Sequence, residues 1–60
     1  MSSLKQSELN SIREVAASHQ TVANKLSAYA GQITDPSIKQ MFTKASNDAR
    51  TSAQNLISML

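Results

Sequence analysis

Apolar residues in the first half of the chain, with one histidine among them, recur at alternating steps of three and four. The positions that keep this spacing are Leu9, Ile12, Ala16, His19, Ala23, Leu26, Ala30 and Ile33. Such a repeat places a stripe along one helix face, as in the a and d positions of a heptad. Val15, Val22 and Tyr29 widen this stripe on one flank. The pattern predicts a helix over about residues 4–31 with neighbours on two sides, because a single partner helix would not cover so wide a stripe.

Small residues dominate one edge of this stripe. The a positions that follow Leu9 are Ala16, Ala23 and Ala30, and small side chains let a neighbouring backbone approach closely. We therefore expect one closely packed helix pair. At the start of the helix, Ser3 with Gln6 resembles a capping box, and Ser7 is an alternative N-cap.

A second periodic segment predicts a helix over about residues 36–59. Its apolar positions are Ile38, Phe42, Ala45, Ala49, Ala53, Leu56 and Leu60. These positions repeat every eleven residues, which favours a straight or slightly right-handed path. The second helix thus differs from the heptads of the first, and the pair is not expected to form a long, regular coiled coil.

The sharpest turn signal lies between the two segments, at residues 31–36. Asp35 precedes Pro36, which suits the first helical position because its missing N–H has no partner there. Asp35 is expected at the N-cap, where its carboxylate accepts bonds from the free N–H groups of the first turn. Gly31 is the only glycine and is expected to close the first helix in a left-handed conformation. An end at Ile33 is the alternative.

These elements predict an all-α fold, an antiparallel helical hairpin that forms one domain over residues 1–60. A chain of this length has a marginal core, and small domains usually add disulfides, metals or oligomerisation. The sequence has no cysteine. We therefore predict a two-fold homodimer, the commonest homo-oligomer, in which two hairpins form a four-helix bundle and the apolar stripes are both core and interface. A loosely structured monomer is the alternative.

Charge and composition argue against several classes of partner. The net charge is +2, and the six basic residues are spread along the chain, whereas nucleic-acid binding requires a concentrated basic face. No apolar run is long enough for a membrane span, and the first residues lack the apolar core of a secretion signal. We expect a cytoplasmic or spore-associated protein.

His19 is the one residue that suggests chemistry. It lies in the middle of the first stripe, and folding about the turn brings it near the level of Asp48 and Ser52. In a dimer, two copies of His19 would meet Asp48 or each other, as at a small metal or proton site. A packed histidine bonded to Asp48, Ser52 or its own helix is favoured, because di-iron bundles need several glutamates and Glu-x-x-His motifs. We expect no catalytic residue, metal site or cofactor.

The stretch Tyr29–Phe42 combines a tyrosine, a turn, Asp35-Pro36 and the following Ile38-Lys39. It resembles the corresponding stretch of Coat F-like spore coat proteins, and Ala53–Leu60 resembles the end of the same helix. The resemblance covers about residues 9–60. It implies the ferritin-like helical-bundle class, which includes short two-helix relatives in spore-forming Firmicutes. Relatives often carry Glu/Gln and His where this chain has Asn47–Ser52, so the resemblance implies a structural role with other coat-like proteins rather than a metal or enzymatic one.

The leading hypothesis is a non-enzymatic structural or interaction protein that works as a dimeric helical bundle. A second hypothesis is an adaptor hairpin that docks on a larger protein instead of its own copy. A third is a degenerate ferritin-like metal-binding protein.

Overall fold

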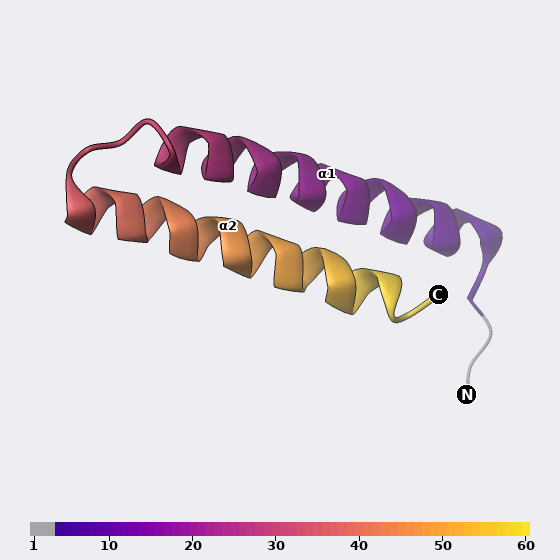
Figure 1. Ribbon diagram of the computed structural model, residues 1–60. Helices are drawn as coiled ribbons and strands as arrows, with labels where there is room; N and C mark the ends of the chain where they lie inside the picture. The colour runs from indigo at the N-terminus through magenta and orange to yellow at the C-terminus, as the bar shows by residue number, and fades with distance from the viewer. Residues whose placement is uncertain (1–3) are drawn as a thin grey trace.

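The computed structural model describes residues 4–60, which form two α-helices joined by a short turn (Figure 1). Helix α1 runs over Gln6–Ala30 and helix α2 over Pro36–Ile57. The helices lie side by side and antiparallel, so that the turn is at one end and the start of α1 and the end of α2 are at the other (Figure 1). Residues 4–60 contain no strand. The predicted all-α hairpin is confirmed.

Helix α1 begins at Gln6, two residues later than predicted, with Lys5 at the N-cap. The backbone N–H of Lys5 donates to the Glu8 carboxylate at 2.7 Å. Glu8 thereby supplies the backward-reaching half of a capping box, and its charge complements the positive end of the helix dipole. Ser7 is not the cap: it lies inside the first turn, where its carbonyl accepts a bond from the Ser11 hydroxyl. Ser3 lies outside the described residues.

Gly31 ends α1 in a right-handed conformation, with φ −65° and ψ −19°, so the expected left-handed closure is wrong. The chain leaves the helix through two tighter bonds instead. The N–H of Gln32 donates to Tyr29 O at 2.9 Å, and that of Ile33 donates to Ala30 O at 3.3 Å. Such i to i+3 bonds tighten a final turn without any residue at positive φ.

Gly31→Ala is expected to stabilise the protein by about 0.5–1 kcal/mol, because alanine restricts the unfolded chain and fits the observed backbone conformation. An added Cβ would lie 3.4 Å from the Ala28 carbonyl oxygen, an ordinary contact distance. Chemical denaturation followed by far-UV circular dichroism measures the change. A clear loss of stability would show that position 31 needs a conformation that only glycine adopts readily.

Helix α2 starts as the sequence predicts. Asp35 is extended, with φ −69° and ψ 119°, and Pro36 occupies the first helical position. The Asp35 carboxylate accepts bonds from the backbone N–H groups of Ser37 at 2.9 Å and Ile38 at 3.2 Å. The cap therefore provides partners for two N–H groups that the helix itself leaves free.

Asp35→Ala should lower the free energy of unfolding by about 1 kcal/mol, since two N–H groups of the first turn lose their acceptor. Asp35→Asn is the matched control, because its side-chain carbonyl accepts the same bonds and asparagine is an equally good N-cap. Urea denaturation of both variants tests the cap. Equal losses in the two variants would mean that the carboxylate charge, and not capping, stabilises α2.

The core of the hairpin is a seam of small residues where the two helices meet. On α1 it consists of Ala16, Ala23 and Ala30, and on α2 of Ser46 and Ala53; all are at most 6 % exposed. Within residues 4–60, the largest fully buried side chain is that of Ser46. The hairpin thus buries small side chains completely and leaves every large apolar side chain at least partly accessible.

The eleven-residue repeat predicted for α2 is wrong as a description of its packing. The buried residues Ser46 and Ala53 are seven apart, and the half-buried Phe42, Ala49 and Leu56 are also seven apart. Ala45, which the eleven-residue pattern placed in the stripe, is exposed. Both helices therefore pack on a heptad spacing.

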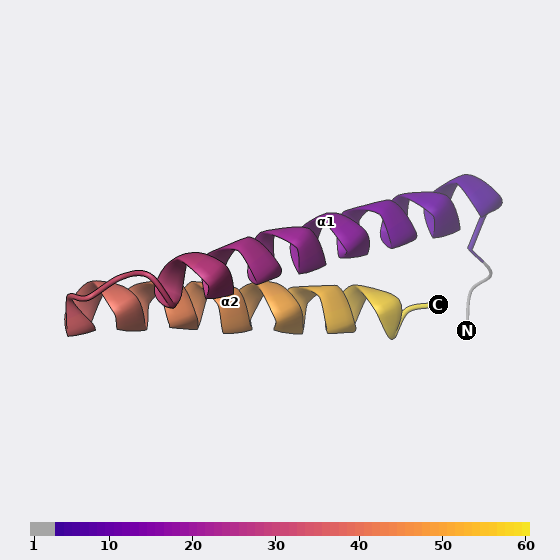
Figure 2. The same cartoon turned by 45° about the horizontal axis from the view of Figure 1, so that its top comes forward.

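Seen from a second direction, α1 is inclined to α2 and rises away from it toward its N-terminal end (Figure 2). The Cα envelope of the chain measures 47 × 17 × 9 Å. The hairpin is therefore a flat layer one helix thick, with two broad faces.

Candidate functional site: the two faces of the hairpin

One side of the seam carries polar bonds between the helices. The Ser46 hydroxyl donates to the Ala23 carbonyl at 2.8 Å and lies 2.6 Å from the Ser27 hydroxyl. The Arg50 guanidinium donates from Nη2 to Ser27 Oγ at 3.2 Å and from Nη1 to Asn24 Oδ1 at 3.1 Å. Four side chains, two from each helix, are thereby joined to one another and to the α1 backbone.

The donor and acceptor roles of the two serine hydroxyls follow from the groups at either end of this series of hydrogen bonds, the Arg50 guanidinium and the Ala23 carbonyl. A hydroxyl has a single hydrogen, and that of Ser46 is used on the Ala23 carbonyl. Ser46 must therefore accept from Ser27, which in turn accepts from Arg50. The donors run one way, from Arg50 through Ser27 and Ser46 to Ala23, and bonds in such a series polarise and strengthen one another. No buried side-chain N or O within residues 4–60 lacks a partner.

These bonds also fix the register of the two helices. Ser46 lies beside Ala23, so that one heptad further from the turn Ala53 comes level with Ala16. Both of these alanines are at most 2 % exposed. A slip of one residue would move the seam residues of one helix by about 100° around its axis. It would break all the hydrogen bonds between the helices described above.

The register determines which residues share each face. Asn24 and Ser27 lie one and four residues after the seam residue Ala23, and Arg50 lies four residues after Ser46, so these positions of both helices share one side of the hairpin. The residues one position before and three positions after each seam residue lie on the opposite side. We call the first side the polar face. It carries Asn10, Arg13, Ala17, Gln20, Asn24, Ser27, Gln40, Thr43, Asn47, Arg50, Gln54 and Ile57.

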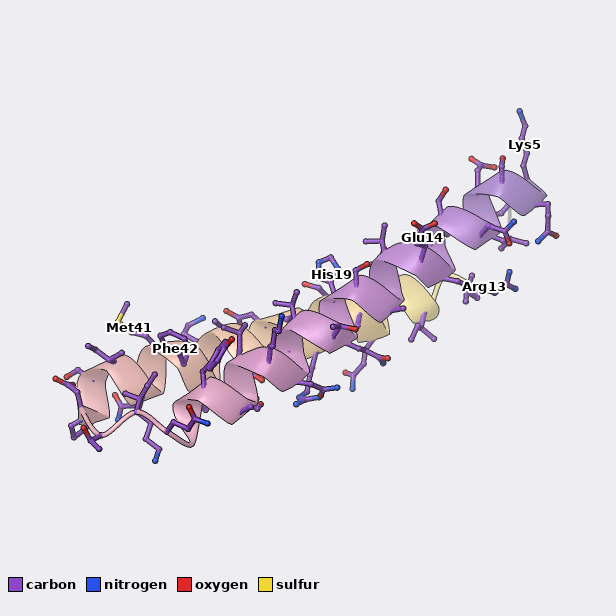
Figure 3. All side chains as sticks on the ribbon, turned by 90° about the horizontal axis from the view of Figure 1, so that it is seen from above. Lys5, Arg13, Glu14, His19, Met41 and Phe42 are labelled. Carbon is purple, nitrogen blue, oxygen red and sulfur yellow. The ribbon has the colours of Figure 1, made fainter. Side chains whose placement is uncertain are left out.

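The opposite side is the apolar face. It consists of Ile12, Val15, His19, Val22, Leu26, Tyr29, Ile38, Phe42, Ala45, Ala49, Ser52 and Leu56. His19 and Met41, which borders this face, project to one side of the hairpin, whereas Arg13 projects to the other (Figure 3). The face carries no charged residue between residues 12 and 56. Glu8 lies on the same side at the start of α1, where its carboxylate accepts a hydrogen bond from the backbone N–H of Lys5.

Large side chains on the apolar face are open to solvent. Val15 is 44 % exposed, Val22 50 %, Tyr29 49 % and Ile38 45 %. Leu26, Phe42 and Leu56 are half-buried, because the seam covers only the flank nearest the other helix. A continuous apolar surface of this kind usually marks a site of interaction.

The residues predicted for the core and interface fall into three groups. Ala16, Ala23, Ala30 and Ala53 are buried in the seam. The half-buried residues are Leu9, Ile12, His19, Leu26, Ile33, Phe42, Ala49 and Leu56, and the exposed ones are Val15, Val22, Tyr29, Ile38, Ala45 and Leu60. Sequence reasoning missed Ser46, Ser27, Asn24 and Arg50. The available signal was that Ser46 lies seven residues before Ala53 and completes the heptad of α2.

His19 bonds to its own helix. Its Nδ1 lies 2.9 Å from the Val15 carbonyl oxygen, so the expected bond to the same helix is present, and neither Asp48 nor Ser52 bonds to the ring. Ser18, His19 and Val22 line a shallow depression of about 200 Å³ on α1 alone. Since α2 contributes no wall, the depression is an irregularity of the helix surface rather than an enclosed cavity.

Lys44 and Asp48 form an exposed ion pair on α2. The Lys44 ammonium pairs with the Asp48 carboxylate at 2.9 Å, four residues along α2. The hydrogen bond to this carboxylate, with its negative charge, raises the pKa of Lys44. Within residues 4–60, no three His, Asp or Glu side chains gather as metal ligands, and neither helix is both long and apolar enough to cross a membrane.

No protein family model, curated protein or solved structure matches this chain.

Proposed function

We propose that this chain is a non-enzymatic structural or interaction protein that works as a homodimer. Two hairpins pack through their apolar faces into a four-helix bundle, and the polar faces remain outside. The observation that carries the proposal is the uncharged apolar face, where Val15, Val22, Tyr29 and Ile38 are each 44–50 % exposed.

The area of this face suits a second hairpin. A layer of 47 × 17 Å has broad faces of about 800 Å² each, and a standard stable interface buries about 800 Å² on each partner. A second copy offers a layer of equal length and width. Helical layers that are apolar on one side are stable when two such layers pack together.

The electrostatics of the face also favour a second copy. Two identical surfaces meet in a two-fold dimer, so any charge on the face would oppose a like charge near the axis. Between residues 12 and 56 the apolar face has none. The seam adds a second reason, because an isolated hairpin with a core of alanine and serine is marginally stable.

The biological setting follows from the resemblance of Tyr29–Phe42 to Coat F-like spore coat proteins. We propose a coat-like assembly in the cytoplasm or on the spore, in which the polar face meets other coat-like proteins. In this arrangement the apolar face forms the dimer and Arg50, Asn24 and their neighbours face the assembly.

Sedimentation equilibrium combined with far-UV circular dichroism over a concentration series tests the proposal. We expect a dimer whose helicity falls on dilution, since association and folding bury the same apolar face. A fully helical monomer at every concentration would contradict it. A poorly helical monomer at every concentration would also contradict it and would favour an adaptor hairpin that folds on a larger protein.

A further inference from the structure

We infer that His19 makes the association of the two hairpins pH-dependent, so that the dimer weakens as the pH falls from 8 to 5. The inference rests on the proposed homodimer and concerns the regulation of its interface.

The position of His19 is the first support. It lies on the apolar face near the middle of α1, between the level of Ala16 and Ala53 and that of Ala23 and Ser46. A facing hairpin that covers the apolar face must cover its middle. His19 is already half-buried in the single hairpin, so association would remove the rest of its ring from water.

The hydrogen bond of the ring decides where a second proton must go. The Val15 carbonyl oxygen can only accept, so Nδ1 carries the hydrogen of the bond. In the neutral ring Nε2 is then an acceptor without a hydrogen. Protonation adds an N–H and a positive charge at Nε2, the atom that is not bonded to the helix.

No charge on the apolar face would offset that of an imidazolium. On α1, Glu14 lies on the outer side, two residues before Ala16, whereas Lys25, two residues after Ala23, borders the apolar face as Met41 does on α2. On α2, Asp48 is paired with Lys44, and the Arg50 guanidinium lies on the polar face bonded to Asn24 and Ser27. The Asp48 carboxylate is thus already paired, and none of these charged groups bonds to the His19 ring.

The facing copy presents the same residues, so its titratable side chains on this face are its own His19 and Tyr29. Phenols do not ionise between pH 5 and 8, whereas an imidazole changes its charge in this range. A charged ring would therefore be enclosed by uncharged and mostly apolar groups, which disfavours the dimer. Where the two rings come together, repulsion between them acts in the same direction.

The expected size of the effect follows from linkage. If only the neutral ring is compatible with the dimer, the dimer is strongest above the imidazole titration and is lost as the pH falls through it. Each copy that must stay neutral weakens association by up to about 10-fold for every pH unit below the pH at which the ring gains its proton, and two copies by up to about 100-fold.

Sedimentation equilibrium of the full chain at a series of pH values between 8 and 5 measures the dissociation constant. His19→Gln is the matched control, because glutamine is polar and hydrogen-bonding but does not titrate. We expect the dissociation constant of the wild type to rise by at least about 100-fold and that of H19Q to stay nearly constant. Far-UV circular dichroism on the same samples reports whether helices are lost as the dimer dissociates.

Three results would overturn the inference. A dimer at pH 8 with the same dissociation constant at pH 5 would overturn it and leave the proposed homodimer standing. The same pH dependence in H19Q would assign the effect to other groups. A wild type that is monomeric at pH 8 would overturn the homodimer and this inference together.

Discussion

Leu26→Asp is expected to dissociate the homodimer and unfold the hairpin in one step. Leu26 is half-buried beside the seam and belongs to the apolar face, so it takes part in both the packing of α1 on α2 and the proposed interface. An aspartate there loses the apolar contacts of leucine and places an unpaired carboxylate in an apolar environment. The loss is at least about 3 kcal/mol for each copy.

This loss is large for a chain of 60 residues, because a small single core rarely supplies more than about 3–5 kcal/mol. Sedimentation equilibrium and far-UV circular dichroism, at a concentration where the wild type is dimeric, measure association and helicity together. We expect L26D to be monomeric and largely unfolded.

Thr21→Asp is the matched control for this variant. Thr21 is exposed and lies two residues before Ala23, on the outer side of α1, so the same new charge there stays in water. T21D should remain a helical dimer. If L26D were instead a stable, fully helical monomer, the core of the hairpin and the interface would be separate surfaces, and the shared-core proposal would fail.

Ala23→Leu is expected to destabilise the hairpin by about 3 kcal/mol, the upper part of the usual range for overpacking. Ala23 is 0 % exposed and its carbonyl accepts the Ser46 hydroxyl at 2.8 Å. A leucine at this position would force the helices apart and break that bond. The seam would then lose contacts on both sides of Ala23, because neighbouring seam residues depend on the same close approach.

Ala28→Leu makes the identical chemical change on the outer side of α1, where Ala28 is exposed. Its effect should stay within about 0.5 kcal/mol. Urea denaturation of the two variants separates packing from the helix preference of leucine, which is close to that of alanine. If A23L were as stable as A28L, the two helices would not be held together by close contact at the seam.

The fold was predictable because its main signals are local. The spacing of Ala16, Ala23 and Ala30 predicts both the helix and its close approach to a neighbour, and Asp35 with Pro36 predicts the start of the second helix. Gly31 shows the limit of such signals. Glycine permits a left-handed conformation but does not require it, and the choice of a right-handed turn depends on the backbone bonds that follow.

The polar contacts were not predictable from hydrophobic spacing. Ser46 is buried because the Ala23 carbonyl and the Ser27 hydroxyl offer it partners across the seam, and these come from residues about twenty positions away. A hydrophobic pattern treats serine as a surface residue and therefore omits Ser46. Without Ser46 the remaining apolar positions of α2 show an eleven-residue spacing, and the heptad is not recognised. Burial of a polar residue depends on its partners, and a partner in the other helix is known only once the register is known.

Pro36 also bears on how two copies of the chain can combine. Helical hairpins can exchange their second helices between copies, and the simplest exchanged form straightens the turn into one long helix. Gly31 is already in a right-handed helical conformation, so only the residues after it would need to change. Pro36 prevents this: it has no N–H to bond the carbonyl four residues earlier, it clashes with that carbonyl, and it disfavours a helical conformation at Asp35. The residue that starts α2 thereby favours folding within one chain over exchange between two.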